Sequence, residues 1–518
     1  MAKVNLDALI PREDFEVIEV VNSGKKKDTI SIEDLKSDSF FFTNVRKPDF
    51  QRETNEWTGQ KICDFIESFV EEDLIPAIIL WRSNSGFIFV IDGSHRLSSL
   101  SSWINDDYGD GKISKLFYDG IVPDDQIKIA EETRRIVRKK VGTYEDFKLA
   151  LSYPEKVRPD ILRRAKNLAA LAIQLQWVEG GASKAENSFF KINQQAAPID
   201  TTELVLLESR KKPNCIAARA IIRGGKGHKY WSKFTTEIQD KIQDLAKEIN
   251  EILFSPQLQT PIKTLDIPIG GRLYSGQTLP LILDFVNIVN NIGSDFKNSL
   301  PDDETGEETI RMLLSVRKVS YRINSDHPSS FGLHPIVYFY SQEGKYKVTS
   351  FYAIVSLLLD LERKNAYKEF IISRERFEKL IQKYDYVIQQ INRKYRSSHA
   401  SYPYIKDFYF KSIILLSSDL NLTEDQVISS LLSETEYSYL TLQLSQEEIT
   451  KTEFTSERKS AVFIKEAMAS APKCQICQGL IHRNSISIDH IVRKSEGGLG
   501  TVDNGQITHP YCNTTFKN

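Results

Sequence analysis

The segment "CQICQGLIHRNSISIDHIVRKSEGGLGTVDNGQITHPYCN" spans Cys474–Asn513, close to the end of a chain of 518 residues. The whole chain contains five cysteines and eight histidines, and three of each lie in this segment. Two pairs have the spacing of metal-binding knuckles, Cys474 with Cys477 and His509 with Cys512. Each pair lets one tight turn present two ligands to the same ion, and two pairs complete the tetrahedron that Zn²⁺ prefers. The sequence therefore predicts a structural zinc site, while a redox-active Cys-x-x-Cys is the alternative.

Residues suited to other chemistry lie between the two pairs. "SISIDHIV" alternates polar and apolar residues as a strand does, and it carries Asp489 and His490 side by side. Neighbours on a strand point to opposite faces, so these two act together only where the chain turns. A glycine-rich loop then leads to Asn504, and "GQITHPYCNTTF" is expected to form a closing helix that carries Asn513. An imidazole, together with a hard cation on carboxylate and amide oxygens, suits the hydrolysis of a phosphate ester.

This segment resembles the HNH endonuclease family, whose fold is two strands and a helix around a metal ion (the ββα-metal fold). The resemblance covers roughly residues 454–518 and implies that His490 is the general base that deprotonates the attacking water. It also implies that Asp489 and Asn513 hold one divalent cation, Mg²⁺ in the first place, and that Asn504 orients the loop after His490. Asn513 stands where many relatives carry the second histidine of the family name. A zinc module without catalysis is the competing interpretation; His482 is expected on a surface loop.

A second region of interest is "PDFQRETNEWTGQKICDFIESFVEEDLIPAIILWRSNSGFIFVIDGSHRLSSLSSWI", residues 48–104. Its periodicity predicts a helix over 60–69, and "AIILW" and "FIFVI" are expected to be the buried strands of a hairpin. Asp92 and Gly93 end the second strand, and Ser94 is expected to cap the next helix. Backbone N–H groups at such a turn can bind phosphate, and Arg96 would add a bidentate donor. A plain strand–turn–helix with a surface arginine fits the same residues.

The region resembles the N-terminal domain of the ParB/sulfiredoxin-like superfamily, in the branch of GmrSD-type modification-dependent restriction enzymes and SspE. The shared features are a Gln-Arg pair, an Ile-Pro pair at 75–76 and an Asp-Gly-x-x-Arg loop, with a further similarity in "AENSFFKINQQAAPIDTTEL" at 185–204. Relatives use this loop to bind and hydrolyse a nucleoside triphosphate that licenses DNA cleavage. The resemblance therefore implies a nucleotide site formed by Gln51, Arg52, Asp92, Gly93, Ser94, His95 and Arg96. Ser94 and His95 replace the two glutamines of the usual Asp-Gly-Gln-Gln-Arg, which leaves hydrolysis open.

Two basic stretches are candidates for DNA contact. "RRIVRKK" at 134–140 would line one helical face, and "IIRGGKGHKYWSKF" at 221–234 combines basic and aromatic residues beside glycines. The predicted contact residues of the second stretch are Arg223, Lys226, Lys229, Tyr230 and Trp231. A loop of this composition can grip phosphates or stack on an exposed base. In the alternative interpretation, Trp231 only anchors a solvated loop to the core.

Composition bounds the class of protein. A chain with 41% hydrophobic and 27% charged residues is typical of globular proteins, and a net charge of −2 excludes a generally cationic DNA coat. The N-terminus lacks the apolar core of a signal peptide, and no later segment has the character of a membrane span. The isolated Cys63 and Cys215 fit a reducing cytoplasm.

Taken together, these features predict a multidomain α+β protein with a ParB-like α/β domain at 1–143, a mainly helical domain at 144–445 and a zinc-containing ββα-metal domain at 446–518. The expected function is that of a cytoplasmic DNA endonuclease that restricts modified phage DNA under the control of a nucleoside triphosphate. An ungated nicking or repair nuclease and a DNA-binding regulator with a silent zinc module are the alternatives. Because one small metal centre usually cuts one strand, double-strand cleavage would need a homodimer or two sequential cuts.

Overall fold

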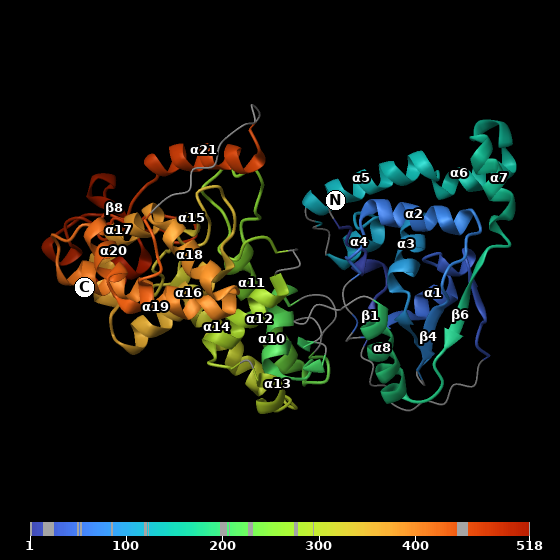
Figure 1. Ribbon diagram of the computed structural model, residues 1–518, viewed down its shortest axis with the longest axis horizontal. Helices are drawn as coiled ribbons and strands as arrows, with labels where there is room; N and C mark the ends of the chain where they lie inside the picture. Colours follow the sequence, from blue (N-terminus) through green and yellow to red (C-terminus); the bar gives the residue numbers. More distant parts are fainter. Residues whose placement is uncertain are drawn as a thin grey trace. The chain divides into compact units, whose positions relative to one another are not determined.

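The structure is a computed structural model that describes residues 3–13, 25–48, 51, 54–83, 86–118, 122, 124–196, 205–206, 208–225, 231–273, 278–293, 295–442 and 454–516. The chain forms two compact units, unit 1 at Met1–Arg210 and unit 2 at Lys211–Asn518 (Figure 1). The mixed α and β multidomain class is as predicted, whereas the three-domain division at residues 143 and 445 stays a prediction. No helix in the described ranges is long and apolar enough to cross a membrane.

Unit 1 is built on a mixed sheet in the strand order β1-β3-β5-β4-β6-β2. The strands are β1 (Arg12–Glu13), β2 (Thr29–Ser31), β3 (Val45–Pro48), β4 (Ile78–Arg82), β5 (Ile88–Asp92) and β6 (Ala172–Trp177). The predicted hairpin is confirmed, because β4 and β5 pair antiparallel with Leu80 opposite Val90. β3 runs parallel to β5, and β6 runs parallel to β4 with Leu175 opposite Ile78.

Helices cover both faces of this sheet. They are α1 (Phe40–Asn44), α2 (Gly59–Val70), α3 (Ser94–Ile104), α4 (Lys112–Phe117), α5 (Asp124–Lys140), α6 (Tyr144–Ser152), α7 (Pro159–Leu168) and α8 (Ala182–Ala196), with 3-10 turns η1 (Asp7–Leu9), η2 (Glu33–Leu35) and η3 (Pro154–Lys156). α2 confirms the helix predicted over 60–69, and the Thr58 hydroxyl caps it by accepting from the Lys61 N–H. The sequence led us to expect Ser94 as the cap of α3, and this expectation is wrong. Gly93 holds the cap position with a φ of 103°, and Ser94 is the first helical residue.

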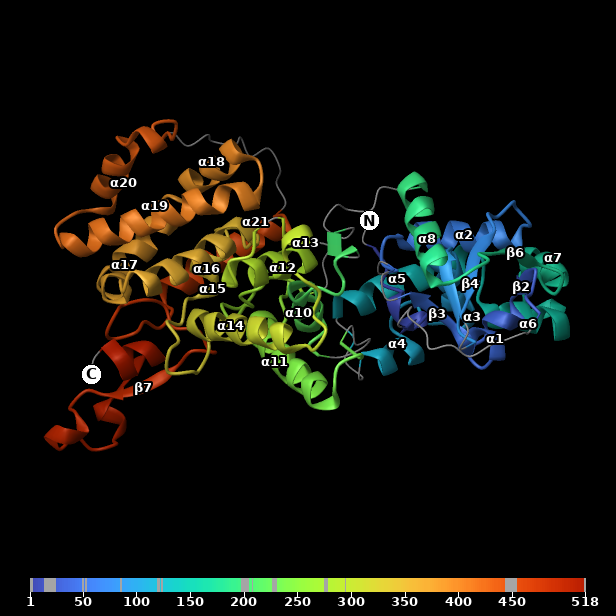
Figure 2. The ribbon, with the colours of Figure 1, turned by 90° about the horizontal axis from the view of Figure 1, so that it is seen from below.

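The alternation of side chains along the hairpin divides the core of unit 1 in two. Leu80 and Val90 face a large core to which α2, α3 and α5 contribute. Trp81 and Phe89 face the opposite side, where Phe189 of α8 packs against them. Figure 2 shows α8 lying along the strands. The sheet is therefore buried on both faces, which explains why its central strands are apolar at nearly every position.

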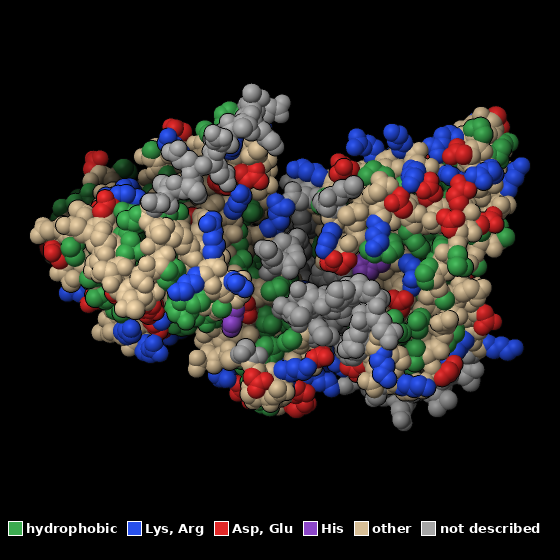
Figure 3. Space-filling view, viewed as in Figure 1, with side chains coloured by type: hydrophobic (Ala, Val, Ile, Leu, Met, Phe, Trp, Pro, Cys, Tyr) green, Lys and Arg blue, Asp and Glu red, His purple; other side chains and the backbone are tan. Residues whose placement is uncertain are grey.

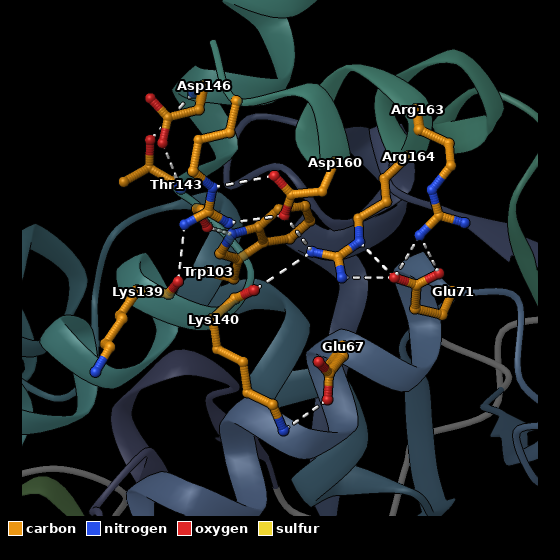
Figure 4. A network of polar contacts seen from close by, with 12 residues as sticks. Glu67, Glu71, Trp103, Lys139, Lys140, Thr143, Asp146, Asp160, Arg163 and Arg164 are labelled. Carbon is orange, nitrogen blue, oxygen red and sulfur yellow. Dashed lines mark hydrogen bonds and ion pairs between the residues drawn. The ribbon is translucent and has the colours of Figure 1, made fainter.

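A polar network joins α2, α5 and α7 (Figure 4). The last carbonyls of α5 lack partners within the helix. Arg158 donates to the Lys139 carbonyl at 2.8 Å, and Arg164 donates to the Lys140 carbonyl at 3.4 Å. Arg164 also donates at 2.6 Å to the carboxylate of Glu71, the C-cap residue of α2. One guanidinium thus caps α5 and holds it on α2.

The basic stretch in α5 is largely ion-paired within unit 1. Arg134 pairs with Asp106 at 2.8 Å and with Asp110 at 2.6 Å, and Lys140 pairs with Asp64 at 2.9 Å. Acidic and basic side chains are accordingly interspersed over this part of the surface (Figure 3). This stretch is a mixed-charge surface rather than a positive stripe.

Unit 2 is mainly helical and ends in a small β-hairpin. Its helices are α10 (Pro213–Ile222), α11 (Thr236–Phe254), α12 (Thr278–Val289), α13 (Phe296–Ser299), α14 (Glu307–Ile323), α15 (Pro335–Tyr338), α16 (Val348–Arg363), α17 (Tyr367–Lys383), α18 (Asp385–Tyr395), α19 (Ser398–Ser418), α20 (Glu424–Leu432) and α21 (Ser456–Ala469), with the 3-10 turn η4 (Thr435–Tyr437). The C-terminal part adds β7 (Ser487–His490), η5 (Lys494–Glu496), η6 (Val502–Asn504), β8 (Gly505–Thr508) and the π-helical turn η7 (Cys512–Phe516). α16 is apolar around most of its circumference and is buried between α12, α14, α17 and α19.

A buried ionic cluster fixes the N-terminal segment of unit 1. The Lys47 ammonium, with an exposed fraction of 0%, lies 2.6 Å from the Asp7 carboxylate. Arg12 contacts the same oxygen at 2.8 Å, and the Thr54 N–H donates to it at 3.0 Å. A buried charge of this kind is tolerated only while its partner remains in place.

We therefore expect Asp7→Ala to destabilise unit 1 by about 3–5 kcal/mol, because two buried cations lose this carboxylate. Four of the five tryptophans, at positions 57, 81, 103 and 177, lie in unit 1, so urea unfolding followed by tryptophan fluorescence reports mainly on this unit. Asp38→Ala, at an exposed position of the same unit, is the matched control. Equal unfolding midpoints for the two variants would contradict the assignment.

Candidate functional site

The four predicted metal ligands converge in unit 2. The three thiol sulfurs and one imidazole nitrogen lie within 4.8 Å of one another, and all four side chains are buried; they belong to Cys474, Cys477, His509 and Cys512. The N–H of Gln475 donates to the Ile507 carbonyl at 3.0 Å, which joins the first knuckle to the strand before the second. A redox pair needs two cysteines, whereas this set supplies the complete tetrahedral donor set of a structural zinc site.

The contacts of His509 fix which ring nitrogen faces the cluster. Nε2 lies 3.1 Å from the Leu480 carbonyl and therefore carries the proton, which leaves Nδ1 toward the thiols, 3.3 Å from Cys477 Sγ. Burial and the charge of Arg374 lower the pKa of His509, so the ring is neutral, the form that binds a metal. Hydrogen bonds from Cys477 and Cys512 lower the pKa of Cys474, and burial raises the pKa of Cys477 to about 11.

The segment between the knuckles forms an antiparallel hairpin. Asp489 lies opposite Gln506, and His490 lies opposite Gly505. The prediction of a closing helix from residue 505 is therefore wrong for residues 505–508, which form β8. Ile507 and Thr508 are β-branched, and Ile507 pairs across the strands with Ile488, so strand pairing prevails over helix formation there. Helical structure begins at residue 510 and continues through η7.

Asn513 is bonded to β7 on the face of the strand that carries Asp489. Asp489 is 8% exposed and accepts a hydrogen bond from Gln506 Nε2 at 2.8 Å. Asn513 donates from its Nδ2 to Ser487 Oγ at 2.7 Å and to the Ile488 carbonyl at 3.3 Å. Ser487 and Asp489 share a face by strand alternation, so these bonds bring the Asn513 amide to the Asp489 face. His490 is the last residue of the strand.

The loop that follows His490 is closed by Asn504. Its Oδ1 accepts from the Val492 N–H at 2.8 Å, and its Nδ2 donates to the Leu499 carbonyl at 2.8 Å. At Gly498 a Cβ atom would lie 1.9 Å from the Val492 carbonyl oxygen, so only glycine fits there. One amide side chain thus sets the path of the chain leaving His490.

The hairpin, the residue before it and the loop between its strands carry an unexpected set of exposed aliphatic side chains. They are Ile486, Ile488, Ile491, Val492, Leu499, Val502 and Ile507. Apolar positions in an alternating strand ordinarily mark the buried face. Here the polar face with Ser487 and Asp489 packs under η7, and the apolar face is solvent-exposed. Sequence alternation alone could not reveal this inversion.

The expectation that His482 lies on a surface loop is wrong. His482 is 1% exposed, its Nδ1 lies 3.2 Å from Asn324 Oδ1, and its ring meets His334 edge to face with centroids 5.3 Å apart. Burial lowers the pKa of His482 to about 4. Leu480 and Ile481, directly before His482, are also buried. These two apolar neighbours were the feature of the sequence that could have indicated the burial of His482.

In unit 1 the motif residues meet at one edge of the sheet. β3 and β5 are parallel, so Gln51 and the loop at 92–96 follow their strands at the same edge, where antiparallel β4 begins. The His95 ring stacks on Trp57 at a centroid distance of 5.6 Å, and the Glu56 N–H donates to His95 Nε2 at 3.3 Å. A cavity of about 480 Å³ is lined by residues 74–77 and 174–176, at the start of β4 and along β6.

Arg96 is held by its own loop. Its NH2 lies 2.6 Å from Asp92 Oδ2 and 3.3 Å from the Ala77 carbonyl. Gly93 is required here, because a Cβ would lie 2.9 Å from Ile78 Cγ1 at a φ of 103°. The buried Gln51 Oε1 and Arg96 Nε have no hydrogen-bond partner among the described residues, which fits a ligand-binding edge. Arg52 lies outside the described residues.

The predicted DNA-contact loop is described only in part. Lys226, Lys229 and Tyr230 lie outside the described residues, and Arg223 caps the C-terminus of α10. Trp231 is 0% exposed, so its ring packs in the interior of unit 2, as in the anchoring alternative, and is not available to a base in this conformation.

Fold and site together define a nuclease. Residues 474–518 match the family model described as HNH endonuclease, and residues 32–209 match the GmrSD restriction endonuclease, N-terminal domain. The chain therefore combines a GmrSD-type N-terminal domain with a C-terminal HNH endonuclease domain, a restriction-type nuclease, and both resemblances found from the motifs are confirmed. No curated protein and no solved structure matches the chain.

The burial of His482 predicts a pH dependence of stability. The folded state keeps this ring neutral to about pH 4, whereas the unfolded chain takes up a proton below pH 6.5, so the stabilisation is present above pH 6.5 and is lost on acidification. Between about pH 7 and pH 5.5 we expect a loss of roughly 1–1.5 kcal/mol. Thermal unfolding should show a steeper fall for the wild type than for His482→Asn. Parallel pH profiles would contradict this expectation.

Proposed function

We propose that the protein is a DNA endonuclease that hydrolyses phosphodiester bonds in its HNH domain with one divalent cation, and that a nucleoside triphosphate bound in the N-terminal domain licenses cleavage. The observation that carries the proposal is the placement of two amides around the Asp489–His490 strand end: Asn513 bonded to β7, and Asn504 closing the following loop. A zinc module without catalysis has no need of either bond.

Two metals with different roles fit the residues. The buried thiols and imidazole suit Zn²⁺, which would hold the segment together. The Asp489 carboxylate and the Asn513 amide offer the oxygen ligands that Mg²⁺ prefers. Because Asn513 uses its nitrogen toward Ser487 and Ile488, its oxygen is the atom that would serve the cation. Once bound, the cation would neutralise charge on the reacting phosphate.

His490 would act as the general base. An imidazole accepts a proton near neutral pH, and the half-buried His490 at the strand end can reach both water and a phosphate at the surface. The hydrogen bonds of Asn504 fix the chain on the C-terminal side of His490, which limits the orientations of the ring. Asp489, held by Gln506, fixes the N-terminal side.

In the N-terminal domain, the loop at 92–96 would bind the phosphates of a nucleoside triphosphate. The Gly93 backbone allows close approach, and Arg96 supplies a charged fork that now rests on Asp92. His95 is engaged by Trp57 and the Glu56 N–H, so it is held at the loop rather than directed to a water. Binding is therefore better supported than hydrolysis.

Nucleotide control suits a nuclease that acts in the cytoplasm on modified phage DNA while sparing the chromosome of its host. In this proposal residues 1–143 sense nucleotide and DNA, residues 144–445 transmit the signal, and residues 446–518 cut. Arg223, Lys226, Lys229 and Tyr230 would contact the DNA backbone. A homodimer would permit cleavage of both strands.

The decisive variant is His490→Ala. We expect Mg²⁺-dependent cleavage of DNA to fall by about 10²–10⁴-fold, because the general base is removed, while bound zinc stays at the wild-type level. Cleavage of modified phage DNA and unmodified plasmid is measured on gels, with and without each triphosphate, and zinc by elemental analysis. His399→Ala, an exposed histidine of α19, is the matched control.

Three results would contradict parts of this function. DNA cleavage by His490→Ala at the wild-type rate would refute the assignment of His490 as the general base. Cutting of unmodified DNA with Mg²⁺ alone would indicate an ungated nicking or repair nuclease. Binding of DNA without cleavage in any divalent metal would indicate a regulator.

Nucleotide binding is tested separately with Arg96→Ala. A charge-assisted hydrogen bond contributes about 1.5–3 kcal/mol, so we expect triphosphate affinity to fall by about 10- to 150-fold in calorimetric titration. Arg138→Ala, an exposed arginine of α5 in the same unit, should bind as the wild type does. Absence of binding by the wild type to every triphosphate would remove nucleotide control from the proposal.

A further inference from the structure

The metal cluster is enclosed by residues that lie far from it in the sequence. Arg374 of α17 is fully buried, with an exposed fraction of 0%. One of its terminal nitrogens lies 3.2 Å from His509 Nδ1, the ligand nitrogen. The same guanidinium donates to the Phe331 carbonyl and, at 2.9 Å, to the Gly332 carbonyl. We call Arg374, Glu378 and residues 328–332 the cradle.

The first knuckle rests on the α17 side of the cradle. The Leu480 N–H donates to Glu378 Oε2 at 3.4 Å. At Gly479 a Cβ would lie 2.4 Å from Arg374 Nε, so the guanidinium packs directly on the backbone of the turn that follows Cys477. Glu378 in turn pairs with Arg374 at 2.8 Å and accepts from the Tyr338 hydroxyl at 2.9 Å.

The second knuckle rests on the loop at 328–332. A Cβ on Gly332 would lie 2.3 Å from His509 Cδ2, so the loop backbone is in contact with the imidazole. The Tyr511 N–H donates to the Ser330 carbonyl at 3.0 Å, and Thr514 Oγ1 donates to the Pro328 carbonyl at 3.0 Å. The cradle therefore supports both halves of the cluster, and Arg374 is the side chain that touches both.

Burying a guanidinium costs desolvation free energy. Replacing a buried ion pair with apolar side chains of similar size is often neutral or stabilising. The presence of Arg374 beside the cluster has a chemical reason. A divalent ion with three thiolates and a neutral imidazole carries a net negative charge, which an adjacent guanidinium offsets. Groups behind the ligands also hold them in the orientation that the metal requires.

We propose that Arg374 is a positioning residue of the metal centre, so that the helical part of unit 2 and the HNH segment form one functional structure. This rests on the metal assignment of the proposed function. The consequence reaches the cleavage site, because the Asn513 N–H donates to the His509 carbonyl at 3.1 Å. A change in the cradle that moves His509 would therefore also move the proposed cation ligand.

The test uses the full chain loaded with zinc, or with Co²⁺ as a spectroscopic probe. Arg374→Met should release zinc to a chelator about 10- to 100-fold faster than the wild type, as typical for residues behind metal ligands. It should also change the visible spectrum of the Co²⁺ protein at temperatures where it is folded. Arg376→Met is the matched control, since Arg376 donates from the same helix to the Asp419 and Leu422 carbonyls and should leave both readouts unchanged.

Arg374→Met also leaves Glu378 without its buried partner, so the double variant Arg374→Met/Glu378→Met removes both charges and keeps the fold accessible. Faster release and an altered spectrum in the double variant would support the inference, even if the single variant does not fold. Wild-type release and spectrum in the double variant would overturn it. A wild-type protein without zinc and without a thiolate–Co²⁺ spectrum would instead overturn the metal assignment itself.

Discussion

The convergence of three thiols and one imidazole within 4.8 Å is the constraint on which the C-terminal segment depends. The hairpin β7–β8 has only four residues in each strand, and its aliphatic face is exposed. Apolar burial therefore contributes little to holding the hairpin and η7 together. Metal binding supplies free energy of folding in such segments, on the order of 10 kcal/mol in small zinc modules. The placement of the proposed cleavage residues follows from this constraint, because Asn513 comes directly after Cys512, and Asp489 lies on the strand that β8 aligns.

In the hairpin β7–β8, the alternation of apolar residues predicts the wrong face as the buried one. The half-buried Ser487 and the buried Asp489 are held by hydrogen bonds from Asn513 and Gln506. These bonds require the polar face inside, and the aliphatic face must then point outward. A protein that only needed a stable hairpin would place the faces the other way. The inversion lies at the proposed cleavage site, and functional sites are where local sequence rules are expected to fail.

Short-range spacing made the metal ligands and the hairpin at 78–92 predictable, because a Cys-x-x-Cys turn and a pair of apolar runs determine local geometry. The helix expected from residue 505 failed because strand pairing with residues 487–490 decides that stretch. The cradle could not be predicted, since Arg374 lies 135 residues from His509 and no spacing rule connects them. The burial of His482 depends equally on Asn324, a distant neighbour. Sequence reasoning therefore predicted which groups would react, a prediction that stays open, and it missed the groups that support the metal cluster.

The proposed cation site in the HNH segment and the proposed nucleotide site in unit 1 differ in the partners that their charged groups have before a ligand binds. In the HNH segment, the carboxylate and amide groups are already held by Gln506 and β7, so a cation would meet an ordered set of oxygens. At the edge of the sheet in unit 1, Arg96 is instead held by Asp92 at 2.6 Å. An incoming phosphate would exchange one anion for another and release the carboxylate. The Arg96 guanidinium would then donate to the phosphate, as would the backbone N–H groups of the loop, and both sets of bonds would contribute to binding. A site that exchanges one anion for another is suited to report on the presence of a nucleotide, whereas a preorganised site is suited to act on a bond.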